Sequence, residues 1–179
     1  ALVDCREIDI RDAEAVDAMI ESIAADHSGI DILVNNAGGS PQSDAATASP
    51  RFEDAIMQLN LMAPYYLARA CHPHLTKSSV GRVSNIAIVS GIRPSPGTAI
   101  YGAAKAGLLN LTQSLAQEWG KDSIRVNAII VGLAETETAE ATYGDTDAQA
   151  AVAASLPLGR MCRGEDVADA VCYLASTAA

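Results

Sequence analysis

The chain has 179 residues, of which 49% are hydrophobic and 19% charged, and this balance predicts one folded domain with a sizeable core. Its 22 acidic and 12 basic residues give a net charge of −10 without a Lys/Arg cluster, which disfavours a nucleic-acid partner. No apolar run reaches the roughly 18 residues of a membrane span and the N-terminal stretch is too charged for a signal peptide, so we expect a cytoplasmic protein without membrane contact.

The first part of the chain alternates strand-like and helix-like patterns. Residues 5–10 (CREIDI) predict a short strand. Residues 12–29 predict a helix, because apolar residues such as Val16 and Ile20 recur at helical spacing before Gly29 ends it. Residues 30–34 (IDILV) form a nearly continuous apolar run, which is typical of a strand buried on both faces.

The same alternation continues to the end of the pattern. Residues 52–75 predict a long helix, residues 81–90 a strand, residues 101–119 a third helix and residues 124–131 another strand. This order predicts an α/β fold, a doubly wound parallel sheet of the Rossmann-like kind in three αβα layers. Ligands of such sheets bind at the carboxyl ends of the strands.

Neither the cysteines nor the histidines predict a metal site. His72 and His74 flank Pro73, which a helix end explains better than a pair of ligands. The four cysteines have no Cys-x-x-Cys or Cys/His ligand spacing, so we expect reduced thiols and no metal; they are Cys5, Cys71, Cys162 and Cys172.

Tyr101 and Lys105 are the first candidates for chemistry. In a helix they lie one turn apart on one face, with small residues between them. A nearby positive charge favours the phenolate and moves the tyrosine pKa toward neutrality, where the side chain exchanges protons readily. The alternative is a helix start with a packed tyrosine and a solvated lysine.

The run NNAGGS, residues 35–40, follows directly after a predicted strand. Ala37 and Gly38 leave the backbone open to close approach by a ligand, while Asn35 and Asn36 offer amides to hold the turn or to bind hydroxyl groups. Such a turn is weak evidence when it stands alone.

Taken together, NNAG after a strand, Asn60 in the next helix and Tyr-x-x-x-Lys at the start of the following helix resemble the classical short-chain dehydrogenase/reductase family. The resemblance implies that Tyr101 is the proton donor or acceptor at the substrate oxygen. It implies that Lys105 lowers the tyrosine pKa and holds the nicotinamide ribose, and that Asn60 places a water in a proton relay. The plain alternative for Asn60 is a mid-helix polar residue bonded to backbone.

The same resemblance implies NAD or NADP as cofactor and assigns further contacts to it. Asp9 with Ile10 would contact the adenine, and Gly132 and Thr136 belong to a loop that bonds the nicotinamide carboxamide. Thr136 as a simple cap and Asp9 as an exposed strand end are the alternatives. The complete set of implied cofactor contacts is Asp9, Ile10, Asn36, Ala37, Gly38, Tyr101, Lys105, Val131, Gly132 and Thr136.

Two positions depart from the family pattern. Ile88 stands where the family has a serine that hydrogen-bonds the substrate oxygen, a donor whose loss typically costs about 100- to 1000-fold in turnover. Ser90 is the nearest substitute, but along a strand it lies about 6–7 Å further on and serves only if the chain turns there. Val131 replaces the proline of the family's Pro-Gly, which is milder because backbone makes that contact.

The chain also lacks the glycine-rich phosphate turn of the family. We therefore expect a single Rossmann-like domain, residues 1–179, that is incomplete at both ends, and NAD cannot be chosen over NADP. The predicted function is interconversion of a secondary alcohol and a ketone. The alternatives are a catalytically weak nucleotide-binding or oligomer-partner subunit, suggested by Ile88, and a less favoured sugar-nucleotide epimerase or dehydratase.

Assembly and substrate charge are the last sequence-based expectations. The helix 101–119 has apolar residues on more than one side, with Ala103, Leu111 and Trp119 pointing away from Leu108 and Leu115, so we expect a second subunit against it in a homodimer or homotetramer. The segment after Thr136 occupies the place of the family's substrate lid and is acidic, which would repel free carboxylates.

Overall fold

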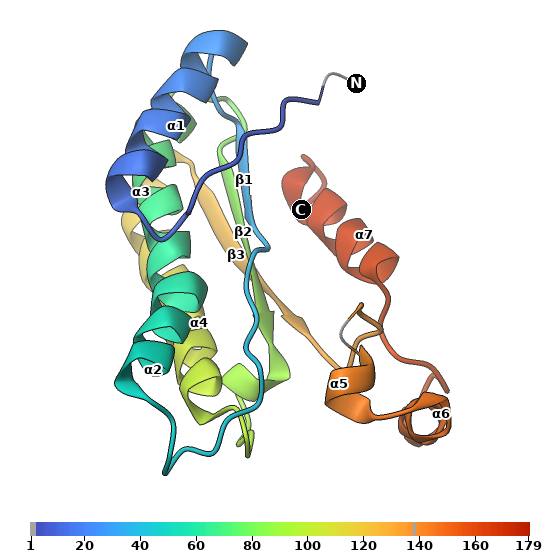
Figure 1. The fold of residues 1–179 in the computed structure, drawn as a ribbon. Helices are drawn as coiled ribbons and strands as arrows, with labels where there is room; N and C mark the ends of the chain where they lie inside the picture. The colour runs from blue at the N-terminus through green and yellow to red at the C-terminus, as the bar shows by residue number, and fades with distance from the viewer. Residues whose placement is uncertain (1–2, 138) are drawn as a thin grey trace.

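The computed structural model describes residues 3–137 and 139–179 (Figure 1). Its centre is a parallel sheet in the order β1-β2-β3, made of Ile32–Asn35, Arg82–Ile88 and Arg125–Val131. Asn35 pairs with Asn85, and Ile88 pairs with Val131, so the carboxyl ends of all three strands meet at one edge. Crossover helices between successive strands enforce this parallel arrangement.

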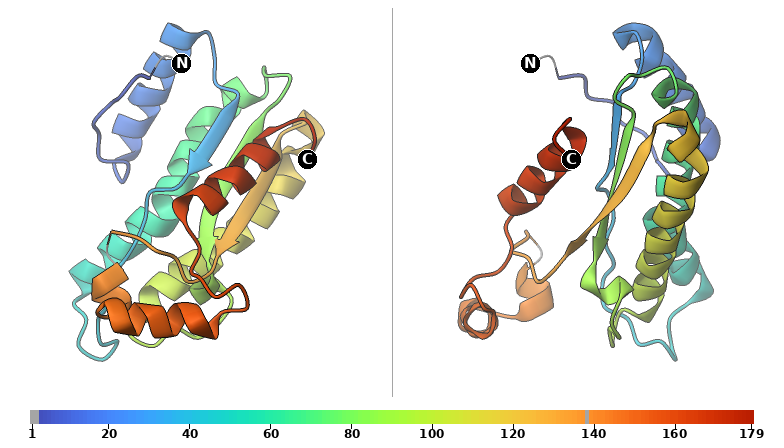
Figure 2. Two further views of the ribbon diagram at one scale, coloured as in Figure 1. Left: turned by 90° about the vertical axis from the view of Figure 1, so that its right-hand side faces the viewer. Right: turned by 180° about the vertical axis from the view of Figure 1, so that it is seen from behind.

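Helices cover both faces of the sheet (Figures 1 and 2). α1, α3 and α4 lie against one face and α7 lies against the other, while α5 and α6 lie at the end of the sheet where β3 finishes. The predicted doubly wound, three-layer αβα fold is thereby confirmed. The helices are α1 (Ala13–His27), α2 (Pro50–Met57), α3 (Ala63–Leu75), α4 (Ala99–Trp119), α5 (Ala139–Tyr143), α6 (Thr146–Ser155) and α7 (Gly164–Ala175).

The apolar core lies between the sheet and α1, α3 and α4. Val16 and Ile20, one turn apart on α1, are buried together with Leu75 of α3 and Val83 of β2. α1 begins at Asp12, whose carboxylate accepts hydrogen bonds from two backbone N–H groups of the first turn. The helical spacing read from the sequence therefore selects the buried face correctly.

A ladder of buried polar side chains ties two strands to α4. Asn35 Nδ2 donates to Asn85 Oδ1 at 2.8 Å, and Asn85 Nδ2 donates to Thr112 Oγ1 at 2.9 Å. The Thr112 hydroxyl in turn donates to the carbonyl of Leu108 at 2.7 Å. Because these bonds are made in the interior, they hold α4 at a fixed height relative to the ends of β1 and β2.

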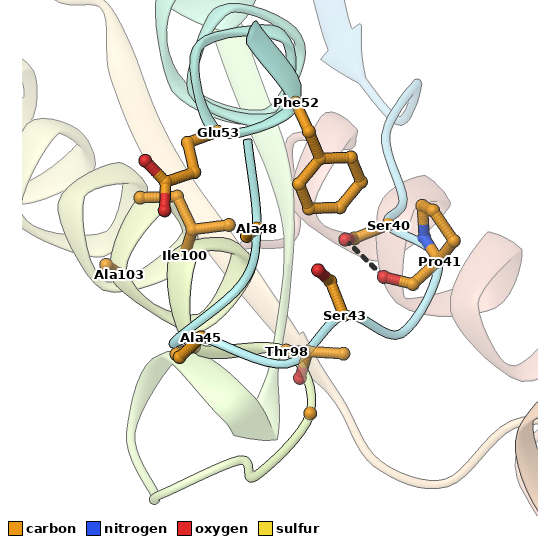
Figure 3. Close-up of a pocket in the computed structure, with 12 residues that line it drawn as sticks. Ser40, Pro41, Ser43, Ala45, Ala48, Phe52, Glu53, Thr98, Ile100 and Ala103 are labelled. Carbon is orange, nitrogen blue, oxygen red and sulfur yellow. Dashed lines mark hydrogen bonds between the residues drawn. The ribbon is translucent and has the colours of Figure 1, made fainter. Parts of the chain in front are cut away.

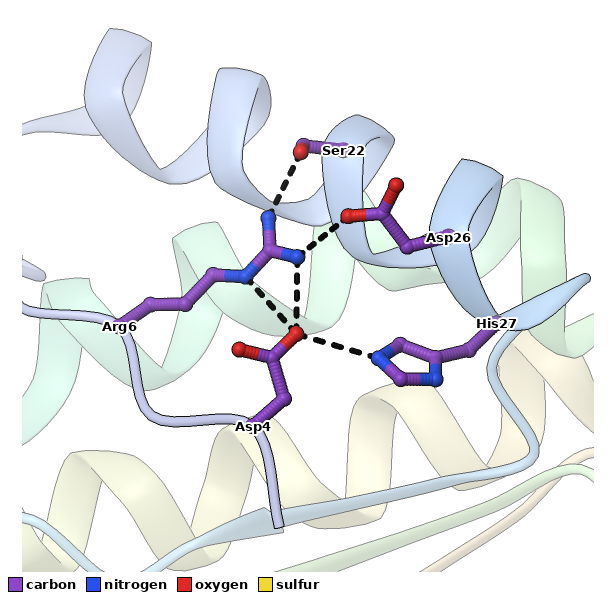
Figure 4. A network of polar contacts seen from close by, with 5 residues as sticks. All are labelled: Asp4, Arg6, Ser22, Asp26 and His27. Carbon is purple, nitrogen blue, oxygen red and sulfur yellow. Dashed lines mark hydrogen bonds and ion pairs between the residues drawn. The ribbon is translucent and has the colours of Figure 1, made fainter. Parts of the chain in front are cut away.

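The predicted strand at residues 5–10 is wrong. The segment is extended but joins no strand of the described chain, and it runs beside α1 instead (Figure 1). A strand needs a neighbouring strand to supply its hydrogen bonds, and this segment has none among the described residues. It is held instead by the Arg6 guanidinium, which lies in a polar cluster that Figure 4 shows. The other members of the cluster are Asp4, Ser22, Asp26 and His27.

Candidate active site

Tyr101 and Lys105 lie in the first turns of α4, where the helix meets the end of β2. A Cβ atom at Gly102 would lie 2.9 Å from the carbonyl oxygen of Ser90, so only a residue without a side chain fits here without a shift. Lys105 is 4% exposed, and its Nζ donates to the carbonyl of Ile86 at 2.8 Å. The same Nζ lies 5.8 Å from the centre of the Tyr101 ring, so the structure brings the two residues together as the spacing predicts.

Burial controls the titration of both groups. It lowers the pKa of Lys105 from 10.5 to about 8, because the interior disfavours the ammonium. It raises the pKa of Tyr101 above its ordinary value, because the phenolate is disfavoured in the same way. In this arrangement the Lys105 ammonium is bonded to the Ile86 carbonyl, and the lowering of the tyrosine pKa by Lys105 stays a prediction.

Asn60 lies beside this pair, in a π-helical turn of the helical segment that precedes β2. The predicted helix 52–75 is in fact α2 and α3 joined by a π-helical turn, Gln58–Met62, and such turns often mark functional sites. Asn60 is fully buried; its Nδ2 donates to the carbonyls of Gly39 and Ile56, and its Oδ1 accepts from the Gly39 N–H at 2.9 Å. The predicted alternative, a helical side chain bonded to backbone, describes these contacts.

The loop after β1 forms one wall of a cradle with these side chains. A Cβ atom at Gly38 would lie 2.7 Å from Asn60 Oδ1 and 3.2 Å from Lys105 Nζ, so glycine is what leaves room beside the lysine. Asn36, Ala37 and Gly38 are exposed and leave their backbone open. A buried ammonium with N–H groups to spare beside bare backbone fits the hydroxyl groups of a nicotinamide ribose.

Comparisons with known proteins agree with this geometry. A family model described as Enoyl-(Acyl carrier protein) reductase matches residues 2–179. The 3-oxoacyl-(acyl carrier protein) reductase of Haemophilus influenzae is 36% identical over 170 residues, which cover 94% of this chain and 69% of the relative. The chain belongs to the short-chain dehydrogenase/reductase family.

Further relatives and solved structures of this short-chain dehydrogenase/reductase are named for other reactions or ligands. The 4-formylbenzenesulfonate dehydrogenase of Comamonas testosteroni is 35% identical over 163 residues, 89% of this chain and 65% of the relative. Aldohexose dehydrogenase of Thermoplasma acidophilum superposes with a TM-score of 0.92 at 26% identity over 98% of this chain and 72% of that one. ElxO with NADP bound gives 0.88 at 26% identity over 96% and 70%. The chain thus spans about two thirds of the length of its curated relatives.

Ile88 and its nearest substitute Ser90 lie close together at the end of β2 in this short-chain dehydrogenase/reductase. Ile88 ends the strand, and the chain then turns through Val89–Gly91, which is the turn that a role for Ser90 requires. The Ser90 hydroxyl oxygen, however, is buried and finds no hydrogen-bond partner among the described residues. The Ser90 hydroxyl is thus available to donate, and its role as the replacement donor stays a prediction.

Four further predicted cofactor contacts lie in the N-terminal segment and in the loop after β3. Asp9 is exposed and its carboxylate binds the Arg11 guanidinium, with Nη2 to Oδ2 at 2.7 Å, and hydrogen bonds from Arg11 lower its pKa to about 2. Ile10 follows in the turn that leads to α1. Gly132 directly follows β3 and has open space where a side chain would stand, and Thr136 is exposed further along that loop. The structure supports open backbone at Gly132 and leaves the other three contacts as predictions.

Two backbone groups that shape the site were not among the predicted residues. The Gly39 backbone holds the Asn60 amide from both sides, and the Ile86 carbonyl holds Lys105. Gly39 has φ +141°, a conformation that favours glycine, and the second glycine of NNAGGS was the available signal for it. A backbone carbonyl such as that of Ile86 carries no signal in the side-chain pattern.

A separate hollow of about 270 Å³ lies near the first turns of α4 (Figure 3). It is lined by residues of the loop after β1, by Phe52 and Glu53 of α2, and by Ile100 and Ala103 of α4. Tyr101, Lys105 and Asn60 do not line it, so it is distinct from the cradle described above.

The described residues contain neither a group of side chains that could hold a metal ion nor a helix that could span a membrane. No group of three or more His, Cys, Asp and Glu side chains among residues 3–137 and 139–179 is arranged to hold a metal ion. No helix in the same residues is long and apolar enough to cross a membrane.

Proposed function

We propose that the protein is an NAD- or NADP-dependent oxidoreductase that interconverts a secondary alcohol and a ketone, with Tyr101 as the acid/base. The observation that carries the proposal is the placement of Tyr101 and Lys105 against the cradle of Gly38 and Asn60 at the carboxyl ends of the strands. The similar structure of ElxO, which has NADP bound, and the names of the relatives support a nicotinamide cofactor.

The residues divide the work as follows. The nicotinamide supplies or accepts hydride at the substrate carbon when it is bound. The Tyr101 hydroxyl gives a proton to the carbonyl oxygen during reduction, and its raised pKa keeps it protonated near neutral pH. Lys105 holds the ribose hydroxyls with the N–H groups that Ile86 leaves free, and Asn60 places water for the return of the proton.

Substitution of Tyr101 tests the proposal. Tyr101→Phe keeps the ring and removes the proton, so we expect turnover with a ketone panel to fall about 100- to 10,000-fold while NADPH affinity stays nearly unchanged. Tyr173→Phe is the matched control, because Tyr173 is 58% exposed on α7. Wild-type-like turnover in Tyr101→Phe would exclude the assignment.

A catalytically weak nucleotide-binding or oligomer-partner subunit is the second candidate. It is favoured by Ile88 in place of a hydrogen-bond donor. Loss of such a donor typically costs about 100- to 1000-fold in turnover. Cofactor binding without measurable turnover across the ketone panel would identify this function, and Ile88→Ser should then raise the rate.

We also propose that the protein assembles as a homodimer or homotetramer through the outer face of α4. The described packing corrects the predicted face, since Leu111 packs against the core and Trp119 is buried in it. The exposed residues in the first two turns of α4 are small, which lets another helix approach closely there; they are Ala99, Ala103 and Ala106. Ala103→Glu should reduce the molar mass measured by light scattering, and an unchanged mass would contradict this interface.

The thiols support a cytoplasmic location as part of the proposal. All four cysteines are free, and disulfides persist mainly in oxidising compartments. Fractionation of the source cells would test the location, and recovery outside the cytoplasm would refute it.

A further inference from the structure

The residues two positions before and two positions after Ile88 both contact the candidate site. Two residues before it, the Ile86 carbonyl accepts the Lys105 ammonium at 2.8 Å. Two residues after it, the Ser90 carbonyl touches the position of Gly102, next to Tyr101. Ile88 itself is extended and partly exposed, so a branched aliphatic side chain stands at the end of β2, in the stretch of chain that contacts the candidate site on either side.

The surroundings of Ile88 are apolar as well. Ile92 follows after the turn and is 59% exposed. Val131 pairs with Ile88 across the sheet, and paired residues of parallel strands present their side chains to the same face. Ile88 and Val131 therefore form an aliphatic wall at the carboxyl end of the sheet.

The segment at the same end of the sheet is strongly acidic. Residues 132–159, which include α5 and α6, contain five carboxylates and no Lys, Arg or His. Figures 1 and 2 show α5 and α6 at the end where β3 finishes and where α4 begins. Arg163 pairs with Glu135 at 3.3 Å; the other four carboxylates are Glu137, Glu140, Asp145 and Asp147.

We infer that the site selects uncharged, apolar ketones and alcohols over anionic ones, with Ile88 as the specificity-determining residue that contacts the apolar group. This inference rests on the proposed function. An anionic substrate would approach a negative surface and meet an aliphatic wall that offers no hydrogen bond to its charge. A neutral substrate is not repelled by the negative charge, and its apolar group gains contact with Ile88.

Arg93 is the basic residue of the turn region that could reverse this preference. It is exposed on the loop between β2 and α4, five residues after Ile88. If Arg93 reached the substrate, carboxylates would be favoured rather than rejected. The experiment therefore compares one substrate skeleton with and without a charge.

The test uses methyl 4-acetylbenzoate and 4-acetylbenzoate, which differ in charge at the same position. Binding to the protein in the presence of NADPH is measured by calorimetry, and kcat/KM is measured in parallel. We expect the ester to be preferred roughly tenfold or more in both readouts, and the preference to shrink in 0.5 M salt because screening weakens the repulsion. Ile88→Ser should weaken ester binding about five- to tenfold and leave carboxylate binding unchanged, whereas Ile88→Val should stay near wild type.

The outcomes separate the two proposals. Equal or tighter binding of the carboxylate, or binding of neither compound, overturns the inference, and loss of that carboxylate binding in Arg93→Ala would name the residue responsible. Preferred binding of the ester without turnover supports the inference and counts against the proposed oxidoreductase. Turnover of both compounds at equal efficiency supports the oxidoreductase and overturns the inference.

Discussion

Replacement of Lys105 by methionine should stabilise the fold while it removes activity. Lowering the pKa of Lys105 from 10.5 to about 8 corresponds to about 3 kcal/mol of unfavourable free energy for the buried ammonium at neutral pH. Methionine is similar in length and carries no charge, so it avoids this cost. It also loses the bond from Nζ to the Ile86 carbonyl, worth about 1 kcal/mol, so we expect a net gain of about 2 kcal/mol in the free energy of unfolding.

The gain should depend on pH in a defined direction. Between pH 8 and 10.5 the unfolded chain binds one proton more than the folded chain at Lys105, so this group makes the wild-type protein more stable as the pH rises. The advantage of Lys105→Met should therefore be largest below pH 8 and disappear toward pH 10.5. Urea unfolding at pH 7 and pH 10 measures it, with Lys121→Met, an exposed position, as the control. A variant that is less stable than wild type at pH 7, or a gap that does not narrow with pH, would refute the reasoning.

Three further substitutions follow from close contacts. Gly38→Ala should displace the Asn60 amide, which lies 2.7 Å from the new Cβ, and lower turnover about tenfold or more with little change in the urea midpoint. Gly81→Ala should destabilise by about 1–3 kcal/mol in urea unfolding, because its Cβ would lie 2.8 Å from a backbone oxygen, whereas Gly120→Ala has open space and should be neutral or slightly stabilising. Asn85→Ala should cost about 2–3 kcal/mol in the same assay because it breaks the buried polar ladder, and a cost below 0.5 kcal/mol would contradict the role given to that ladder.

The order of strands and helices could be predicted because it depends on local periodicity. Val16 and Ile20 recur at helical spacing, and the run at residues 30–34 is uninterrupted, so each segment carries its own signal. Residues 5–10 carry a strand-like pattern too, but a strand also needs a neighbour, and the pattern contains no information about that neighbour. The error at this segment therefore has a physical cause that periodicity cannot detect.

The candidate site divides along the same line. Tyr101 and Lys105 were predictable together because four residues make one helical turn, whatever the tertiary structure does. The direction of the Ser90 hydroxyl was not predictable, because it depends on how the turn after β2 packs on α4. The π-helical turn at Asn60 was also hidden, because it is defined by backbone hydrogen bonds that the side-chain pattern does not show.

The burial of Lys105 and Tyr101 links the geometry of the site to its proposed chemistry through their pKa values. Lys105 stays charged in the interior at a cost, and the Ile86 carbonyl together with the fixed height of α4 holds it where that charge is useful. With Ile88 in place of a donor, the substrate oxygen has Tyr101 as its proposed proton partner, and the burial that keeps this tyrosine protonated favours reduction near neutral pH. Oxidation needs the phenolate, so it should become efficient only as the pH rises toward the raised pKa of Tyr101.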